Sequence, residues 1–325
     1  MPAVSVVMPL RNEERHLADA VAAVVDQGYP GDLQIVLAVG PGQDDTLGVA
    51  RRLAAADDRI VVVENPSGRT PDALNLALAA ASNEVIVRVD GHGFLSHGYI
   101  EHAVRLLEQT GAANVGGVML AVGVTDFEKA VAVAMRSPLG VGGARFHTGG
   151  RPGPADTVYL GVFRREVLDS VGGYDARFAR AQDWELNYRI RQGGGVVWFD
   201  PDLTVQYRPR PTLRQLALQY RDYGRWRRVV AVRHQGSINL RYLAPPTALA
   251  ACALGLVGGF VWRPLWLVPA AYLAGVGVGG VAIARDEDPT VAARLPVVLA
   301  TMHFSWGWGF LTSRPNHLMA TDGAQ

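Results

Sequence analysis

The feature that most constrains the fold is an alternation, over the first 90 residues, between short β-branched runs and amphipathic helical stretches. The β-branched runs predict buried strands at residues 4–8, 33–39, 60–63 and 85–89. The segments between them predict helices at residues 13–25, 46–56 and 70–81. Strands that alternate with helices in this way form βαβ units and a parallel sheet. We therefore expect a Rossmann-like α/β domain.

A polar loop follows each predicted strand, at residues 9–12, 39–45, 65–69 and 90–92. Ligands of open α/β sheets bind at the carboxyl ends of the strands, where such loops meet. We expect these four loops to converge on one crevice. Residues 111–202 are less regular and rich in glycine, which is typical of loops that close over a ligand.

Asp90 comes directly after a predicted strand, and His92 follows two residues later. A carboxylate and an imidazole so placed can hold a divalent metal against a diphosphate. Mg²⁺ prefers oxygen ligands, whereas Mn²⁺ also accepts imidazole. The alternative is a turn that Asp90 caps. The expected position of Asp90 in the crevice favours the metal site.

Asp183 and Glu185 lie at the start of a predicted helix over residues 184–191. An acidic first turn is favoured by the helix dipole, which is the structural interpretation of this pair. The functional interpretation is a general base, because a carboxylate can take the proton of an attacking hydroxyl. Asp183 is the first candidate for that role, and Glu185 is its rival.

The charge of the chain is unevenly distributed. The whole chain has 31 basic and 30 acidic residues, a net charge of +1, which argues against a nucleic-acid-binding protein. Residues 204–241 nevertheless contain nine arginines and one aspartate, a local net charge of +8. Leucines and aromatic residues lie between these arginines. The segment predicts a basic amphipathic helix at an anionic membrane surface, and a solvated arginine-rich helix face is the alternative.

Residues 243–262 and 265–284 contain no charged residue, and each stretch is long enough for one membrane crossing. Residues 295–312 form a third, shorter uncharged stretch. We expect a domain at residues 1–203, the basic interfacial segment at 204–241, and a transmembrane region of two to three helices at 242–325. The positive-inside rule places the basic segment, and with it the first domain, on the cytoplasmic side. The single cysteine, Cys252, excludes a disulfide framework.

Taken in order, the motifs of this chain resemble those of family 2 glycosyltransferases. The resemblance covers about residues 3 to 240, and it is strongest to the membrane-anchored branch of ExoA-like succinoglycan glucosyltransferases. The motifs that carry it are Pro9-Leu10-Arg11-Asn12-Glu13, Asp44, Asn65-Pro66-Ser67-Gly68-Arg69 with Asn75, Asp90-Gly91-His92, Gly172-Gly173-Tyr174-Asp175 and Asp183-Trp184-Glu185-Leu186-Asn187.

The resemblance implies a GT-A fold and an inverting transfer from a nucleotide sugar. It implies Asp183 as the catalytic base and a divalent metal, Mn²⁺ or Mg²⁺, on Asp90, with His92 where the family has a second aspartate. It implies a nucleotide-sugar site formed by Pro9, Arg11, Asn12, Glu13, Asp44, Arg69 and Asp90. Val39-Gly40 stands where relatives carry paired aspartates, one of which reads the base. A UDP-sugar is the favoured donor, with a GDP-sugar as the alternative.

The expected acceptor is a hydroxyl of a polyprenyl-linked saccharide, because the basic segment and the apolar stretches bring the site to a bilayer. Five residues are expected to line the acceptor site: His147, Trp184, Glu185, Arg225 and Trp226. The expected location is a bacterial plasma membrane, as a multi-pass protein with a cytoplasmic catalytic domain. Two alternatives remain: a polyprenyl-phosphate sugar synthase, and a non-catalytic membrane scaffold that retains the fold.

Overall fold

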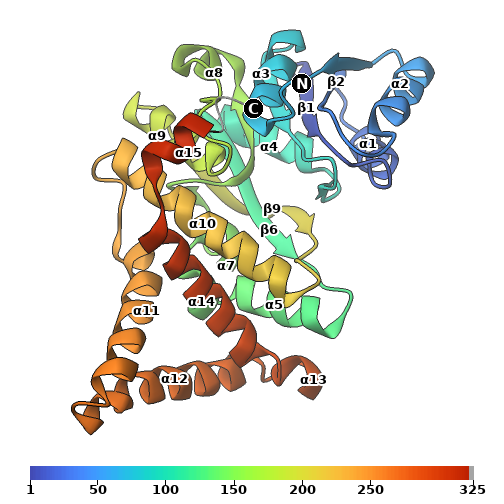
Figure 1. The fold of residues 1–325 in the computed structure, drawn as a ribbon. Helices are drawn as coiled ribbons and strands as arrows, with labels where there is room; N and C mark the ends of the chain where they lie inside the picture. Colours follow the sequence, from blue (N-terminus) through green and yellow to red (C-terminus); the bar gives the residue numbers. More distant parts are fainter. Residues whose placement is uncertain (322–325) are drawn as a thin grey trace. The chain divides into compact units, whose positions relative to one another are not determined.

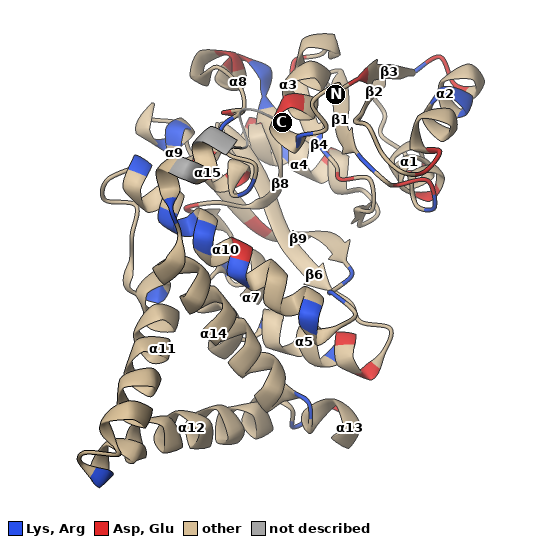
Figure 2. Cartoon of the chain, in the orientation of Figure 1, with Lys and Arg blue, Asp and Glu red and all other residues tan. Residues whose placement is uncertain are grey.

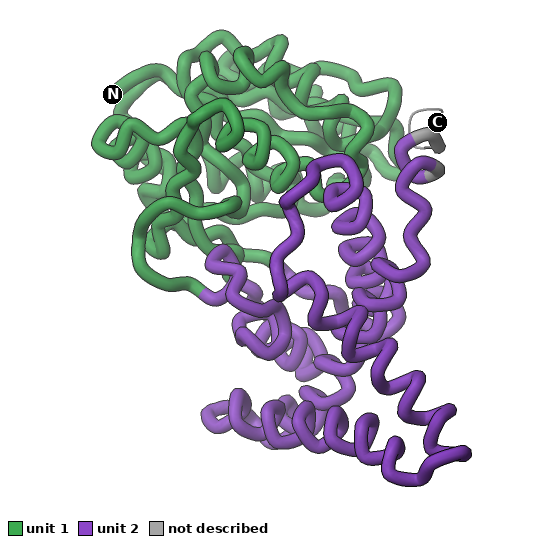
Figure 3. Tube along the Cα trace, turned by 90° about the vertical axis from the view of Figure 1, so that its left-hand side faces the viewer, with its two compact units in different colours: residues 1–120, 149–207, 325 green, residues 121–148, 208–324 purple. Residues whose placement is uncertain are grey.

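The computed structural model describes residues 1–321, which divide into two compact units, coloured separately in Figure 3. Of the described residues, unit 1 comprises 1–120 and 149–207, and unit 2 comprises 121–148 and 208–321. The sequence analysis placed residues 121–148 in the catalytic domain and ended that domain at residue 203. The structure instead groups residues 121–148 with the C-terminal helices and extends unit 1 to Tyr207.

Unit 1 is built on one sheet that, in the described part of the chain, has nine strands. The strands are β1 (Val4–Leu10), β2 (Leu33–Val39), β3 (Ile60–Glu64), β4 (Val85–Arg88), β5 (Phe94–Leu95), β6 (Asn114–Ala121), β7 (Gly153–Pro154), β8 (Tyr159–Arg164) and β9 (Val197–Tyr207). Their order is β3-β2-β1-β4-β8-β6-β9-β5, and β7 pairs with β9. Strands β1 to β4 pair in parallel, whereas β8 pairs antiparallel with both β4 and β6.

Helices cover both faces of this sheet (Figure 1). They are α1 (Leu17–Val25), α2 (Thr46–Ala56), α3 (Thr70–Ala80), α4 (Tyr99–Thr110), α8 (Arg165–Val171) and α9 (Gln182–Gln192). Side chains of a strand alternate between faces, so β4 contributes Val87 to one core, with α1 and α4, and Ile86 to the other, with α3, α8 and α9. This three-layer packing positions the strand ends that the sequence predicted to form a crevice.

The predicted elements of the first 90 residues are confirmed with small changes at their ends. The structure extends the first strand to Leu10, and the first helix begins at Leu17 rather than at residue 13. Residues 13–16 instead form a turn, in which the backbone N–H of His16 donates to the carbonyl of Glu13. A larger difference is β9, which runs to Tyr207, whereas the sequence predicted a short strand at residues 196–199.

Unit 2 consists of helices. They are α5 (Asp126–Arg136), α6 (Pro138–Val141), α7 (Arg145–Thr148), α10 (Leu213–Arg233), α11 (Leu240–Gly258), the 3₁₀ helix η1 (Arg263–Trp266), α12 (Leu267–Ile283), α13 (Pro289–Ala292), α14 (Leu295–Thr312) and α15 (Pro315–Thr321). Helix α5 begins with a capping box of Thr125 and Glu128, and the buried Glu128 also pairs with Arg208 at 2.9 Å. This ion pair and the packing of α5 against α14 explain why residues 121–148 belong to unit 2.

Helices α10 and α14 approach each other so closely that only glycine fits at the contact. A Cβ atom at Gly224 would overlap the carbonyl oxygen of Trp306, and one at Gly309 would overlap that of Arg221. Gly307 lies in the same way against Pro245, at the start of α11. These glycines therefore fix how α10, α11 and α14 pack within unit 2.

Two helical segments of unit 2 are long and apolar enough to cross a membrane: α11, and η1 together with α12. Both are almost free of charge, whereas α10 carries a series of arginines (Figure 2). Large apolar side chains at the junction of α11 and α12 are exposed, among them Phe260 at 84% and Val261 at 92%. The third uncharged stretch forms α14, which does not meet the same criteria.

Candidate active site

The ends of the first three strands meet in unit 1, as the alternating sequence pattern predicted. The backbone N–H of Gly40, after β2, donates to the carbonyl of Leu10 at the end of β1. The N–H of Asn65, after β3, donates to the carbonyl of Val39. Gly68 lies against the ring of Pro41 and within van der Waals reach of the Arg11 guanidinium. Arg11 is thus placed where the strand ends form one surface.

The loop after β1 is fixed to the loop after β2 by side-chain hydrogen bonds. Asn12, whose φ of 59° lies in the left-handed region, accepts a 2.7 Å hydrogen bond from the N–H of Gln43. Asp44 accepts from the backbone N–H of Glu14 at 3.1 Å and from the hydroxyl of Thr46 at 2.6 Å. Desolvation raises the pKa of Asp44, but these hydrogen bonds outweigh it and lower the pKa overall. Asp44 is therefore an ionised structural link between the loops.

The loop after β3 forms a second network around Asp72. The hydroxyl of Ser67 and the guanidinium of Arg69 both donate to Asp72, at 2.5 and 2.9 Å. Asn65 accepts from Ser67 and donates to the carbonyl of Arg69. A hollow of about 450 Å³ adjoins this loop. Its lining residues are Asn65, Pro66, Ser67, Asp72, Asn75 and Leu76.

The centre of the site is a cluster of two carboxylates around one buried arginine. Arg88, at the end of β4 and 4% exposed, donates to Asp90 Oδ1 through Nη2 at 3.0 Å. Its Nη1 forms an ion pair with Oδ1 of Asp183 at the start of α9. Burial lowers the pKa of Arg88, but the charge of Asp90 outweighs it and raises the pKa, so the guanidinium stays charged. The structure thus brings together Asp90 and Asp183, which are far apart in the sequence.

Sequence reasoning did not identify Arg88. The available signal was a charged residue inside an apolar run, next to the aspartate already singled out. Buried arginines are rarely found without partners, so a second carboxylate near Asp90 was to be expected. Tyr174, also buried, lies with its ring 5.9 Å from the Arg88 guanidinium carbon. The Gly172-Gly173-Tyr174-Asp175 motif therefore contributes one of the side chains that surround Arg88.

The two acidic residues in the first turn of α9, Asp183 and Glu185, have different surroundings. The residue before it, Ala181, has a φ of 60°, a left-handed conformation that is strained for alanine. The Asp183 side chain is 33% exposed, and its Oδ2 has no hydrogen-bonding partner among residues 1–321. Glu185 is buried and pairs with Arg189 at 2.7 Å. Arg189 also donates to the carbonyls of Val171 and Gly173, so Glu185 stabilises the glycine turn.

The metal ligands predicted from the sequence lie beside the arginine cluster. The Oδ1 atom of Asp90 accepts from Arg88, and Oδ2 has no hydrogen-bonding partner among the described residues. His92 Nδ1 lies 2.8 Å from Glu13 Oε1, and Gly91 is packed against Leu10 and Glu13. A carboxylate oxygen and an imidazole nitrogen are kinds of ligand that Mn²⁺ accepts. The roles of Asp90 and His92 as ligands stay predictions.

Another group of potential metal ligands lies elsewhere in unit 1. His102, on α4, is near Asp200 and Asp202, on β9, with 3.6 Å between His102 Nε2 and Asp200 Oδ1. Strands β8 and β6 lie between β4 and β9, so about 14 Å, or three strand spacings, separate this group from Asp90. It is therefore not the diphosphate site. The Asp200 carboxylate, 8% exposed, also accepts from the backbone of Asp202, which fixes its position.

Three of the five predicted acceptor residues lie in unit 2. His147, on α7, stacks near Phe146, and burial with the added charge of Arg241 lowers its pKa to about 3. Trp226, on α10, is only 5% exposed and packs in the helical core. Arg225 lines a cavity. The other two lie in unit 1: Glu185 is buried, and Trp184 stacks on Tyr188 with 5.4 Å between ring centroids. Their roles stay predictions.

The fold is similar to that of solved protein structures. The chain is similar to a mannosyltransferase from Pyrobaculum calidifontis solved with GDP-Man and Mn²⁺ (TM-score 0.60, 20% identity, 95% of this chain and 86% of that one). It is also similar to TarS residues 1–349 of S. aureus, solved with UDP-GlcNAc (TM-score 0.52, 13% identity, 95% and 91%). The fold is therefore that of the GT-A glycosyltransferases.

The sequence comparisons refine this class. The family model described as "Glycosyl transferase family 2" matches residues 5–172, and the chain belongs to that family. The succinoglycan biosynthesis protein ExoA of Rhizobium meliloti is 33% identical over 94% of this chain and 93% of its own length. A dolichyl-phosphate-sugar glucuronosyltransferase of Methanococcus voltae is 21% identical over 94% of this chain and 95% of its own. The protein is a glycosyltransferase, so the non-catalytic scaffold is not retained.

Proposed function

We propose that this protein transfers a sugar, with inversion, from a nucleotide-diphosphate sugar to a hydroxyl of a lipid-linked saccharide at the cytoplasmic face of a bacterial plasma membrane. The observation that carries the proposal is the Arg88 cluster, which holds Asp90 and Asp183 at one point beside the strand ends. A donor-side carboxylate and a base at a short separation are what a single displacement at an anomeric carbon requires.

The donor is bound by the loops at the strand ends. Arg11, with Arg69 in the next loop, supplies positive charge for a diphosphate, and Asn12, Glu13 and Asp44 give the loops their shape. Asp90 and His92 would hold a divalent ion, which would supply positive charge to offset that of the departing nucleoside diphosphate. The two structural neighbours were solved with GDP-Man and UDP-GlcNAc, which supports a nucleotide-sugar donor without choosing the base.

Asp183 is the proposed general base. Its Oδ1 is held by Arg88, which orients the carboxylate, and its Oδ2 remains able to accept the proton of an acceptor hydroxyl. The deprotonated oxygen then attacks the anomeric carbon, and the bond to the diphosphate breaks. Glu185 is not assigned this role because its carboxylate is buried and paired with Arg189.

The lipid-linked acceptor is proposed from unit 2. Apolar side chains along α11 and α12, such as Leu254 at 73% exposure and Val278 at 72%, are suited to lipid rather than to water. The arginines of α10 precede these helices, and positive charge on that side favours a cytoplasmic orientation with two crossings. The Methanococcus voltae relative is named for a dolichyl-phosphate-linked sugar, which supports an acceptor of this class.

The test is Asp183→Asn in the full-length protein, with Asp169→Asn, an exposed carboxylate on α8, as the matched control. Transfer by Asp183→Asn is expected to fall about 10²- to 10⁴-fold, while donor binding and the activity of the control stay unchanged. Product formation is followed by chromatography, and the anomeric configuration by NMR. Full transfer by Asp183→Asn would overturn the assignment of the base.

A polyprenyl-phosphate sugar synthase is the second candidate, favoured by the cluster of arginines in unit 2. A lipid phosphate is already ionised and needs no general base. This candidate predicts that Asp183→Asn still transfers sugar to bare polyprenyl phosphate. Transfer only to a saccharide hydroxyl, with loss in Asp183→Asn, decides for the first proposal.

A further inference from the structure

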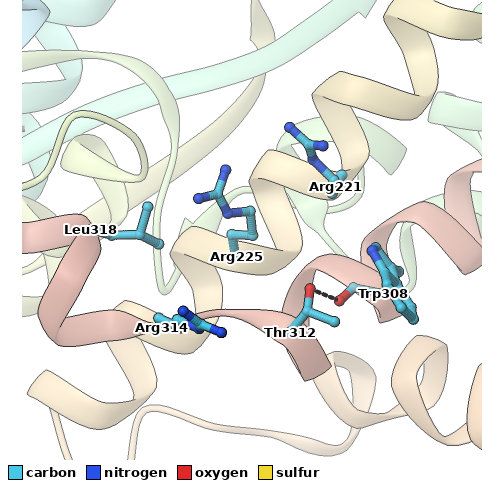
Figure 4. Close-up of a pocket in the computed structure, with 6 residues that line it drawn as sticks. All are labelled: Arg221, Arg225, Trp308, Thr312, Arg314 and Leu318. Atoms are coloured by element: carbon cyan, nitrogen blue, oxygen red, sulfur yellow. Dashed lines mark hydrogen bonds between the residues drawn. The ribbon is translucent and has the colours of Figure 1, made fainter. Parts of the chain in front are cut away.

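Unit 2 contains a cavity of about 360 Å³ whose walls come from α10, α14 and the start of α15 (Figure 4). Arg221 and Arg225 project from α10, and Arg314 lies at the turn between α14 and α15. The remaining lining residues are Trp308, Thr312 and Leu318. We refer to this cavity as the arginine pocket.

The arginine pocket has more positive charge than its neighbours neutralise. Among residues 1–321, Asp222 is the single carboxylate that pairs with these arginines, 3.7 Å from Arg221 and 3.4 Å from Arg225. Among residues 1–321, no carboxylate forms an ion pair with Arg314. Three guanidinium groups and one carboxylate leave a formal charge of +2. Since like charges repel, this arrangement is stabilised by an anion from outside the chain.

The helices hold these arginines in place without help from a ligand. The glycine contacts at Gly224 and Gly309 bring the backbones of α10 and α14 together directly beneath the pocket. The hydroxyl of Ser313 donates to the carbonyl of Arg225 at 2.9 Å, which ties the end of α14 to α10. The side chains of Arg221 and Arg225 remain 42% and 34% exposed, so a ligand can reach both.

The chemistry of the pocket matches a phosphate group. Arginine presents paired N–H donors in a planar fork, which suits the oxygens of a phosphate or diphosphate. Trp308, 58% exposed, and Leu318 add apolar surface beside the charges. Tryptophan is enriched at the boundary of water and lipid. The pocket therefore suits an amphiphile, with a phosphate next to a hydrocarbon chain, better than a free anion.

The position of the pocket along α14 also points to lipid. Trp308 and Thr312 lie in the C-terminal part of α14, and Gly307 in the same part packs against Pro245, near the start of α11. Helix α11 is the first of the two segments suited to cross a membrane. Within unit 2, the pocket therefore lies at the level where the chain would enter the bilayer.

We propose that the arginine pocket binds the phosphate or diphosphate group of a membrane lipid. The inference rests on the membrane attachment in the proposed function, but not on sugar transfer by unit 1. A lipid-linked acceptor and an anionic phospholipid offer the same chemistry from two sources, and the experiment separates them.

The experiment measures binding to the full-length protein in nanodiscs of neutral phosphatidylcholine. The probes are polyprenyl diphosphate, phosphatidylglycerol and inorganic pyrophosphate. The variants are Arg225→Gln and Arg314→Gln, and the matched control is Arg233→Gln, an exposed arginine in the last turn of α10. Saturable binding of a lipid probe is expected to weaken about tenfold in each pocket variant and to stay unchanged in the control.

Preference for polyprenyl diphosphate supports a lipid-linked acceptor as the source, and preference for phosphatidylglycerol supports a bound phospholipid. Equal weakening in Arg233→Gln, no saturable lipid binding, or binding of pyrophosphate alone would overturn the proposal.

If Arg225→Gln does not fold, the lipid binding of Arg314→Gln, a variant of an exposed arginine, tests the proposal. UDP-sugar and GDP-sugar binding is measured in the same samples. If the unaltered protein binds neither donor, the result counts against the proposed function and not against lipid binding by the arginine pocket.

Discussion

Arginine has opposite surroundings in the two units. In unit 1, the buried Arg88 lies between Asp90 and Asp183, so its charge is neutralised by the chain itself. In unit 2, Arg221, Arg225 and Arg314 gather around one cavity, and Asp222 is the one carboxylate of the described residues that pairs with them. In the first arrangement the chain supplies the partners of the arginine, whereas in the second the described residues leave an excess of positive charge.

The difference separates a positioning role from a binding role. A charge buried with its partners fixes side chains, because breaking either ion pair leaves an unpaired charge in a low-dielectric environment. Exposed charges without partners contribute little to folding and remain free to attract an anion. Arg88 is accordingly a positioning residue for the carboxylates of the active site, whereas the arginine pocket is a binding site.

The largest expected effect is that of Arg88→Met. It leaves Asp90 and Asp183 as neighbouring carboxylates without a cation, and the free energy of unfolding is expected to fall by about 3 kcal/mol. Arg225→Gln, in contrast, removes one of several like charges and is expected to change stability by less than about 0.5 kcal/mol. Urea unfolding of both variants in detergent checks the contrast. Similar losses would show that the pocket arginines are structural after all.

The next effect concerns the helix contact beneath the pocket. Gly224→Ala would place a methyl group on the Trp306 carbonyl, and we expect a loss of about 1–3 kcal/mol. Gly275→Ala, in α12, is the matched control because nothing lies within 4 Å of its Cβ position. The control should be neutral or slightly stabilising, since alanine favours helix over glycine. Equal stability of the two variants would contradict the close packing of α10 and α14.

The smallest effect is on pH dependence in unit 2. The pKa of His147 is lowered to about 3, so the folded state keeps it neutral while the unfolded state binds a proton below about pH 6.5. Its contribution to stability is therefore complete above pH 6.5 and is lost as the pH falls toward 3. Between pH 7 and pH 5, the unaltered protein should lose about 1–2 kcal/mol more than His147→Gln. If the free energy of unfolding changes equally with pH in the two proteins, the burial of His147 is contradicted.

Local patterns in the sequence sufficed for the strands and helices of the first 90 residues, because alternating burial leaves a clear period in the residues themselves. They also predicted that the loops after β1, β2 and β3 meet, since parallel strands share one edge. They did not indicate that residues 121–148 group with unit 2, because the partners of α5 are distant in sequence: Arg208 and helix α14.

The active site, too, was predicted only in part from the sequence. Asp90 and Asp183 were identified by residue type and motif order, but the sequence did not show that Arg88 joins them, because Asp183 lies 95 positions from Arg88. Residue type alone did not distinguish Asp183 from Glu185, although the family motif favoured Asp183. Only packing decides that Glu185 is buried against Arg189 while one oxygen of Asp183 stays open.

By itself, the sequence determined the α/β alternation, the basic segment and the uncharged stretches, because periodicity and charge are properties of neighbouring residues. The tertiary structure decided which charges meet. It neutralises Arg88 in unit 1 and leaves the arginines of unit 2 around a shared cavity, since electrostatic energy depends on separation in space and not along the chain.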